Sequence, residues 1–181
     1  MSRISIPSVE QSVESSKPLL AAVQKQLGVT PNLMKLVGHS PAALEGYLSL
    51  NGALAKGSLN VQLRERIALA IAEYNACDYC LSAHDFLGRN VAKISDAEIN
   101  AARGARSEDP RTEAALQFAL RVAQSRGRVS DTELAALRQA GFDEAAVIEI
   151  VANVAVNVLT NYINNVAQTD IDFPVVNAKA A

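Results

Sequence analysis

Apolar residues recur every three or four positions along most of this chain, which is the period of a helix that turns one side to a core. Leu63, Ile67 and Ile71 illustrate this spacing. The alternation of apolar and polar residues that marks strands is nearly absent. The pattern therefore predicts an all-α protein of about eight helices.

Capping signals mark where these helices begin and end. Hydroxyls and carboxylates that accept from free amides commonly precede a helix, and glycine commonly follows it. Ser95…Glu98 and Ser130…Glu133 have the spacing of a capping box. The last and longest helix is predicted to begin at Asp143.

Composition narrows the class of protein. A length of 181 residues with 49% hydrophobic residues suffices for one domain, residues 1–181, with its own core. The tail, about 169–181, is expected to be extended and then frayed. The net charge is -2, the basic residues are scattered, and the aromatic content is 4% without Trp. These features argue against a nucleic-acid partner.

Location follows from two further features. The most apolar stretch, AVIEIVANVAVNVL, contains Glu149, Asn153 and Asn157 and falls short of the roughly 20 apolar residues of a membrane span. No apolar signal core is seen near the N-terminus, and two cysteines do not make a secreted disulfide framework. We therefore expect a cytoplasmic protein without a membrane segment.

Candidate chemistry is concentrated in EYNACDYCLSAHD, residues 73–85. NACD favours a break, so Cys77 is expected to begin a new helix that stops at Gly88. Cys77, Cys80 and His84 would then share one face of that helix. Free amides at a helix start stabilise a thiolate, and His84 can exchange a proton with Cys80.

The preceding helix carries two carboxylates that could complete such a site. If it folds back beside the thiol helix, Glu65 can reach His84 and orient its imidazole. Glu73 has the same potential at shorter range, although it could simply be solvated. The region from about residue 60 to 90 is therefore the expected core of the site.

The spacing Glu-x11-Cys-x2-Cys-x3-His, within LRERIALAIAEYNACDYCLSAHD, resembles the alkylhydroperoxidase D branch of the carboxymuconolactone decarboxylase superfamily. TPNLMKLVGHSPAALEGY and VSDTELAALRQAGFDEAAVIEIVANVA also resemble it. The resemblance implies an all-helical fold that assembles as a homo-oligomer (dimer, trimer or hexamer). It also implies a cofactor-free dithiol that reduces hydroperoxides or a peroxiredoxin-type partner and is restored by an external protein or lipoyl dithiol.

Carried over by position, the resemblance makes Cys80 the peroxidatic thiol, Cys77 the resolving thiol, and Glu65 with His84 the proton relay. Position along the helix alone would favour Cys77 as the more acidic thiol. A base within reach acts directly on proton transfer, which favours Cys80.

Two positions depart from the family pattern. Tyr79 stands between the cysteines, where some members carry a relay histidine, and a phenol with a pKa near 10 cannot replace imidazole in that role. Asn165 stands where related chains often have histidine.

Other interpretations remain open. The two cysteines could be small core residues, or Cys77, Cys80 and His84 could bind zinc with a Glu or His39, although no second ligand knuckle exists. We expect His39 to be a loop or capping residue and the site to hold no metal. A lactone decarboxylase and a redox-sensing scaffold without turnover are the alternative functions.

A polar stripe crosses the last helix. Glu149, Asn153, Asn157, Asn161 and Asn165 recur every four residues and wind by about 40° per step. The stripe could be a solvated edge, an oligomer seam or the wall of an active site.

Overall fold

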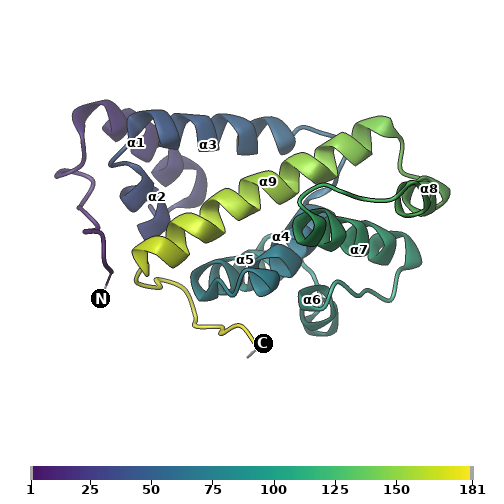
Figure 1. The fold of residues 1–181 in the computed structure, drawn as a ribbon. Coiled ribbons are helices and arrows are strands. Elements are labelled where there is room, and N and C mark those ends of the chain that lie inside the picture. Colours follow the sequence, from purple (N-terminus) through teal and green to yellow (C-terminus); the bar gives the residue numbers. More distant parts are fainter. Residues whose placement is uncertain (1, 180–181) are drawn as a thin grey trace.

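The computed structural model describes residues 2–179 and contains nine α-helices and no strand within them (Figure 1). The predicted all-α class is confirmed, with one helix more than expected. After a short 3-10 turn, Glu14–Ser16, the α-helices are α1 Lys17–Leu27, α2 Asn32–Val37, α3 Pro41–Leu54, α4 Val61–Tyr74, α5 Asp78–Asn90, α6 Asp96–Arg103, α7 Pro110–Ser125, α8 Asp131–Gln139 and α9 Glu144–Ala167.

Helix α4 lies at the centre of the core. Residues 67–72 are all buried, so this part of α4 is covered on every side. It packs against α5, α6, α7 and α9, while α9 also packs against α3 (Figure 1). Helix α5, which begins directly after Cys77 and contains Cys80, therefore packs against the most buried part of the molecule.

Two glycines lie at close contacts between elements, and one of them, Gly88, is not the helix stop that the sequence predicts. Gly88 lies inside α5, which continues to Asn90, because α6 packs closely there: a Cβ on Gly88 would meet Ile99 Cδ1 at 3.3 Å. Gly57 follows a helix that already ends at Leu54, and its backbone lies against the carboxylate of Glu149.

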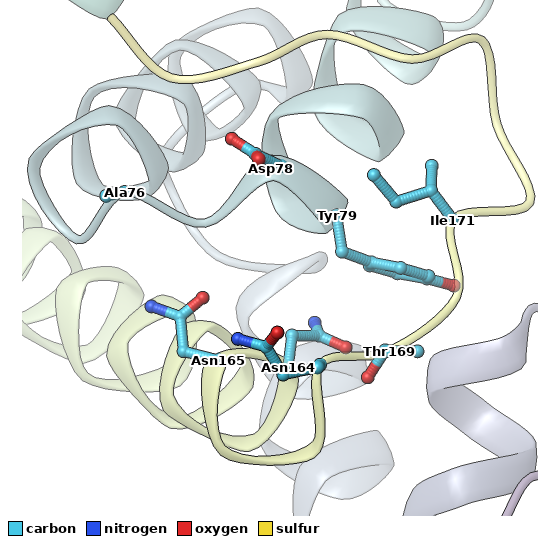
Figure 2. A pocket seen from close by; sticks show the side chains of 8 residues that line it. Ala76, Asp78, Tyr79, Asn164, Asn165, Thr169 and Ile171 are labelled. Carbon is cyan, nitrogen blue, oxygen red and sulfur yellow. The ribbon is translucent and has the colours of Figure 1, made fainter. Parts of the chain in front are cut away.

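The C-terminal tail is extended, as predicted, but it is not frayed over residues 169–179. The backbone amides of Val176 and Ala178 donate to Ser82 Oγ (2.9 Å) and Asp78 Oδ1 (2.7 Å) of α5. The Phe173 ring packs edge-on against Tyr79, and Figure 2 shows the tail passing this tyrosine. Composition could not reveal these partners; residues 180–181 lie outside the described residues.

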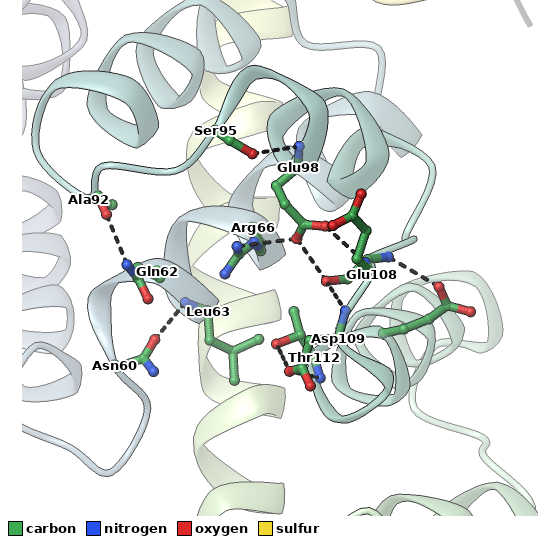
Figure 3. Close-up of polar contacts among 12 residues, drawn as sticks. Asn60, Gln62, Leu63, Arg66, Ala92, Ser95, Glu98, Glu108, Asp109 and Thr112 are labelled. Carbon is green, nitrogen blue, oxygen red and sulfur yellow. Dashed lines mark hydrogen bonds and ion pairs between the residues drawn. The ribbon is translucent and has the colours of Figure 1, made fainter.

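The two predicted capping boxes have different outcomes. Ser130 and Glu133 form the complete reciprocal pair at the start of α8. Ser95 Oγ accepts from the Glu98 amide, but the Glu98 carboxylate turns away to accept from the Glu108 amide at 2.8 Å and pair with Arg66 at 3.1 Å (Figure 3). This carboxylate joins the segment between α6 and α7 to α4 and so serves packing rather than capping.

Helix α9 is long and apolar enough to cross a bilayer by length and composition alone, with a mean hydropathy of 1.5. However, 44% of the window concerned is buried inside the molecule. The core helix of a globular protein meets the same criterion, so this is weak evidence for a membrane span.

Candidate active site

The two cysteines lie at the start of α5, as their spacing predicts. Cys77 is the N-cap residue, and its Sγ accepts from the Cys80 amide at 3.3 Å. Both are free thiols, 0% and 3% exposed for Cys77 and Cys80. Ala76, with a φ of +48°, forms the sharp turn from α4 into this position.

Glu65 of α4 and His84 of α5 come together across the two packed helices. Glu65 Oε2 lies 2.8 Å from His84 Nδ1, so the predicted approach of these side chains is confirmed. Burial alone would lower the pKa of His84. The charge of Glu65, its hydrogen bond and the neighbouring Cys80 together raise that pKa, which favours the imidazolium.

The sulfur of Cys80 is surrounded by groups that favour its anionic form. Burial opposes ionisation, but hydrogen bonding with Cys77, the charge of His84 and the amides of Asn164 and Asn161 lower the Cys80 pKa to about 7. Asn164 Nδ2 donates to Cys80 Sγ at 3.2 Å. Hydrogen bonding with Cys80 and burial raise the Cys77 pKa. Cys80 is therefore the more acidic thiol of the pair.

The asparagine stripe of α9 lies inside the molecule, which excludes a solvated edge. Asn153, Asn157, Asn161 and Asn164 are all buried. The intervals between them are four, four and three residues. The three-residue interval offsets the rotation around the helix that four-residue intervals accumulate, so the four side chains stay on one face of α9. Asn164 therefore reaches the sulfur, whereas Asn165 Nδ2 donates to the Asn75 carbonyl at 2.8 Å.

Tyr47 of α3 is a neighbour of the site that the sequence pattern did not reveal. Burial, together with the negative charges of Cys80 and Glu65, raises the pKa of Tyr47 to about 12 and keeps the phenol protonated. Tyr47, Glu65 and His84 line a small pocket of about 40 Å³. Only tertiary packing brings α3 here, and no local motif around Tyr47 signals it.

Metal binding finds little support in the geometry. Nδ1 of His84 is occupied by Glu65, and His39 Nε2 lies 2.8 Å from the Ser5 carbonyl. Within residues 2–179 no group of three or more His, Cys, Asp or Glu is placed to hold a metal ion. The arrangement can instead generate a thiolate next to a second thiol and an imidazole.

Comparison with known proteins gives one family match and several structural neighbours. The model of the carboxymuconolactone decarboxylase family matches residues 41–125, which contain Glu65, both cysteines and His84. The alkylhydroperoxidase AhpD core of an uncharacterized peroxidase-related protein from Ralstonia eutropha JMP134 superposes with a TM-score of 0.83 at 26% identity, covering 94% of this chain and 92% of that chain. The family match and this structural likeness support the alkylhydroperoxidase D-like branch of the carboxymuconolactone decarboxylase superfamily as the family of the chain.

Two further solved structures share this alkylhydroperoxidase D-like fold. One is an uncharacterized peroxidase-related protein from Silicibacter sp. TM1040, with 19% identity, 93% and 89% of the two chains covered and a TM-score of 0.80. The other is a cysteine-to-alanine variant of the debrominase Bmp8 in complex with 2,3,4-tribromopyrrole, with 21% identity, 94% and 91% covered and a TM-score of 0.77. At these identities the likeness is one of fold. No curated protein sequence matches the chain significantly.

Two of the expected accessory residues of this alkylhydroperoxidase D-like chain are engaged elsewhere. Glu73 pairs with Arg103 at 2.5 Å and accepts from the Lys179 amide, so the structure does not bring it to the thiols. Tyr79 donates to Asp172 Oδ1 at 2.8 Å and accepts from the Leu33 amide at 3.0 Å. Burial raises the pKa of Tyr79 further, so its hydroxyl acts as a structural link.

Replacing Tyr79 by phenylalanine is expected to lower the free energy of unfolding by about 1–3 kcal/mol, because it leaves the buried Leu33 amide without its acceptor. Urea unfolding followed by circular dichroism measures this difference. Tyr74→Phe is the matched control, since Tyr74 is exposed, and should change stability by less than about 0.5 kcal/mol. Equal effects of the two variants would contradict a structural role for the Tyr79 hydroxyl.

Proposed function

We propose that this chain is a thiol-dependent hydroperoxidase or disulfide reductase that cycles Cys77 and Cys80 between dithiol and disulfide. One observation carries the proposal. The Cys80 sulfur, with a pKa of about 7, accepts from Asn164 and lies in the field of the His84 imidazole that Glu65 orients. Such a sulfur is substantially ionised at neutral pH, and the thiolate is the nucleophilic form.

In the proposed cycle the Cys80 thiolate attacks the terminal oxygen of a hydroperoxide. A sulfur–oxygen bond forms, the oxygen–oxygen bond breaks, and the sulfur gives up two electrons to become a sulfenic acid. The departing alkoxide or hydroxide takes a proton, for which the imidazolium of His84 is the proposed donor. The Cys77 thiol then condenses with the sulfenic acid, releasing water and forming the disulfide.

An external dithiol must return the two electrons by thiol–disulfide exchange. A lipoyl group, another protein dithiol or a peroxiredoxin-type partner would supply this chemistry. Such donors belong to a reducing compartment, so we propose a cytoplasmic location. The cycle as written needs no cofactor.

The thiol state after one equivalent of hydrogen peroxide tests the reaction class. Mass spectrometry of the alkylated protein should show a Cys77–Cys80 bridge, and Cys77→Ser should instead show a sulfenic acid that dimedone traps at Cys80. Two unmodified thiols after the treatment would reject the proposal. A bridge that forms slowly and changes the assembly, without turnover in the presence of a dithiol, would favour the redox-sensing scaffold.

Two other reactions can be examined in parallel assays. The family name makes carboxymuconolactone a necessary substrate to test, and its turnover by a protein lacking both cysteines would favour a decarboxylase. The fold likeness to Bmp8 makes bromide release from 2,3,4-tribromopyrrole the second test. The proposed function predicts peroxide reduction at Cys80, no turnover of carboxymuconolactone and no release of bromide.

We also propose that the outward face of α9 binds a second copy of this chain. From Ile148 onward, the exposed side chains of α9 lie within an arc of about 80° on the helix, and all are hydrophobic: Ile148, Val151, Ala155, Leu159, Tyr162 and Val166. No charged residue occurs between Ile150 and Thr169. Depletion of charge and an apolar seam are typical of the centre of a self-association interface.

Leu159→Arg is expected to dissociate this assembly, because it places a charge in the middle of the apolar face. Light scattering after gel filtration should give a multiple of the 19.2 kDa chain mass for the parent and a smaller mass for the variant. Val91→Arg alters an exposed apolar residue outside α9 and serves as the control. A monomeric parent, or association with lipid vesicles through the same face, would overturn the assignment.

A further inference from the structure

Three asparagines, Asn75, Asn161 and Asn165, form a chain of amide groups beside the thiols. Asn75 lies in the turn between α4 and α5, and the other two belong to the end of α9. Asn165 Nδ2 donates to the Asn75 carbonyl at 2.8 Å, and Asn75 Nδ2 donates to Asn161 Oδ1 at 2.9 Å. Figure 2 shows Asn165 pointing from α9 toward the turn that carries Ala76. The turn that leads into the thiol helix is therefore held to α9 by side-chain amides.

The bond from Asn75 sets the direction in which the Asn161 amide faces. An asparagine amide has an acceptor oxygen on one side and a donor NH2 group on the other. Asn161 gives its oxygen to Asn75, so its NH2 group is turned away from Asn75 and into the interior, where the residue is 0% exposed. Asn165 keeps Asn75 in place through the bond to its carbonyl.

Nδ2 of Asn161 is a buried donor that lacks a partner of ordinary geometry within the described residues. Asn164, about one turn further along α9, donates to Cys80 Sγ at 3.2 Å. The Asn161 amide is also close enough to this sulfur to lower the Cys80 pKa. Unsatisfied buried donors are unfavourable and rare in native proteins. This one therefore indicates a donor held for a state in which the nearby sulfur carries more charge.

The thiolate of Cys80 is such a state. The sulfur of a neutral thiol is a weak acceptor, whereas a charged acceptor makes shorter and stronger hydrogen bonds. Asn164 and Asn161 then offer two donors to the anionic sulfur, in addition to the charge of His84. Donors that are directed before the charge appears need no reorganisation when it does. A fixed Asn161 amide thus stabilises the thiolate more than one that is free to turn.

We propose that Asn75 is a positioning residue, which holds the Asn161 amide so that Nδ2 faces the Cys80 sulfur when that sulfur becomes anionic. This inference rests on the proposed function, which makes Cys80 the reacting thiol. Asn165 contributes by fixing Asn75. The bonds of Asn75 and Asn165 go to each other and to Asn161 rather than to the sulfur, so both residues act through Asn161.

The midpoint of Cys80 ionisation tests this role without any peroxide. In a Cys77→Ser background Cys80 is the one remaining thiol, and its thiolate can be followed by ultraviolet absorbance as the pH is raised. Asn161→Ala removes the donor and should raise the midpoint by about one pH unit, and Asn75→Ala should produce most of that rise. Asn90→Ala removes an exposed amide at the other end of α5 and should leave the midpoint unchanged.

A double-variant cycle separates positioning from a general loss of packing. If Asn75 acts through Asn161, Asn75→Ala should raise the midpoint by no more than about 0.2 unit once Asn161→Ala is present. Rises that add in full would overturn the proposal, and so would an Asn75→Ala midpoint equal to that of Asn90→Ala. The comparison of Asn75→Ala with Asn90→Ala remains decisive if Asn161→Ala does not fold.

The pH profile of activity is a second readout, which a loss of stability would not reproduce. In an active parent, Asn75→Ala should lower kcat/KM for tert-butyl hydroperoxide about threefold or more at pH 7. It should match the parent near pH 9, where Cys80 is ionised in both proteins. A deficit that persists near pH 9 would overturn the positioning role.

The outcomes distinguish this role from the proposed function. The expected midpoints combined with no hydroperoxide consumption by the parent would overturn the proposed function and leave the positioning of Asn161 by Asn75. An active parent whose Cys80 midpoint is unchanged by Asn75→Ala would overturn the positioning role and leave the proposed function.

Discussion

Cys80→Ser is expected to lower hydroperoxide consumption by about a thousandfold or more, because a serine hydroxyl is not ionised near neutral pH and cannot take up the peroxide oxygen. The measurement is the rate of loss of tert-butyl hydroperoxide with excess dithiol, compared between the parent and the variant. Serine keeps the size of the side chain and can accept the Asn164 amide, so the fold around α5 should survive.

Cys77→Ser distinguishes the two thiols in the same assay. It should reduce one equivalent of hydroperoxide rapidly and then stop or slow, because no neighbouring thiol resolves the sulfenic acid. Full turnover by Cys80→Ser would reject the assigned roles. A first turnover that is lost in Cys77→Ser and kept in Cys80→Ser would reverse them. Circular dichroism and gel filtration of both variants check that the fold is intact.

Local sequence signals identified the part of the site that depends on helical spacing. The interval from Cys77 to His84 places both on one face of any helix, and the break before Cys77 fixes where that helix begins. Glu65 could be assigned to His84 because a short turn between α4 and α5 requires the two helices to lie side by side. These inferences needed only neighbours in the chain.

The remaining parts of the site come from segments distant in sequence, and single-sequence patterns do not specify such packing. Tyr47 reaches the site from α3, and Asn164 from the end of α9. The four-residue repeat of asparagines predicts Asn165 as the last member of the stripe. About three helical turns separate Asn153 from Asn164, so Asn164 is the residue that lies on the buried face. The tail looked frayed by composition because its stabilising hydrogen bonds lie on α5.

Helix α9 departs from the usual distribution of side chains, because it buries asparagines among its inward-facing apolar residues and exposes other apolar residues. Buried amides are unfavourable unless they find partners, and Asn153 and Asn157 bond to backbone carbonyls four residues before them. Asn161 and Asn164 instead surround the sulfur of Cys80. The buried amides thus provide dipoles for a thiolate, and the exposed apolar face provides the proposed contact with another chain.

Glu65→Gln is expected to shift the ionisation of Cys80 to higher pH. Glu65 raises the pKa of His84, so its removal lowers that pKa and reduces the imidazolium fraction near neutrality. The Cys80 thiolate then loses positive charge beside it, and its pKa rises above the parent value of about 7. A hydrogen bond to a charged group contributes about 1.5–3 kcal/mol, and about 1.4 kcal/mol corresponds to one pKa unit, so we expect a rise of about one unit.

The pH dependence of iodoacetamide alkylation in a Cys77→Ser background measures this ionisation. The rate should increase with pH through the Cys80 pKa in both proteins, with the midpoint about one unit higher in Glu65→Gln. Hydroperoxide reduction at pH 7 should fall about a hundredfold or more, because the relay loses its orienting carboxylate in addition to the thiolate fraction. Glu73→Gln removes a carboxylate that pairs with Arg103 away from the thiols, so it should leave the midpoint unchanged. A common midpoint for Glu65→Gln and the parent would mean that His84 does not transmit the charge of Glu65 to the sulfur.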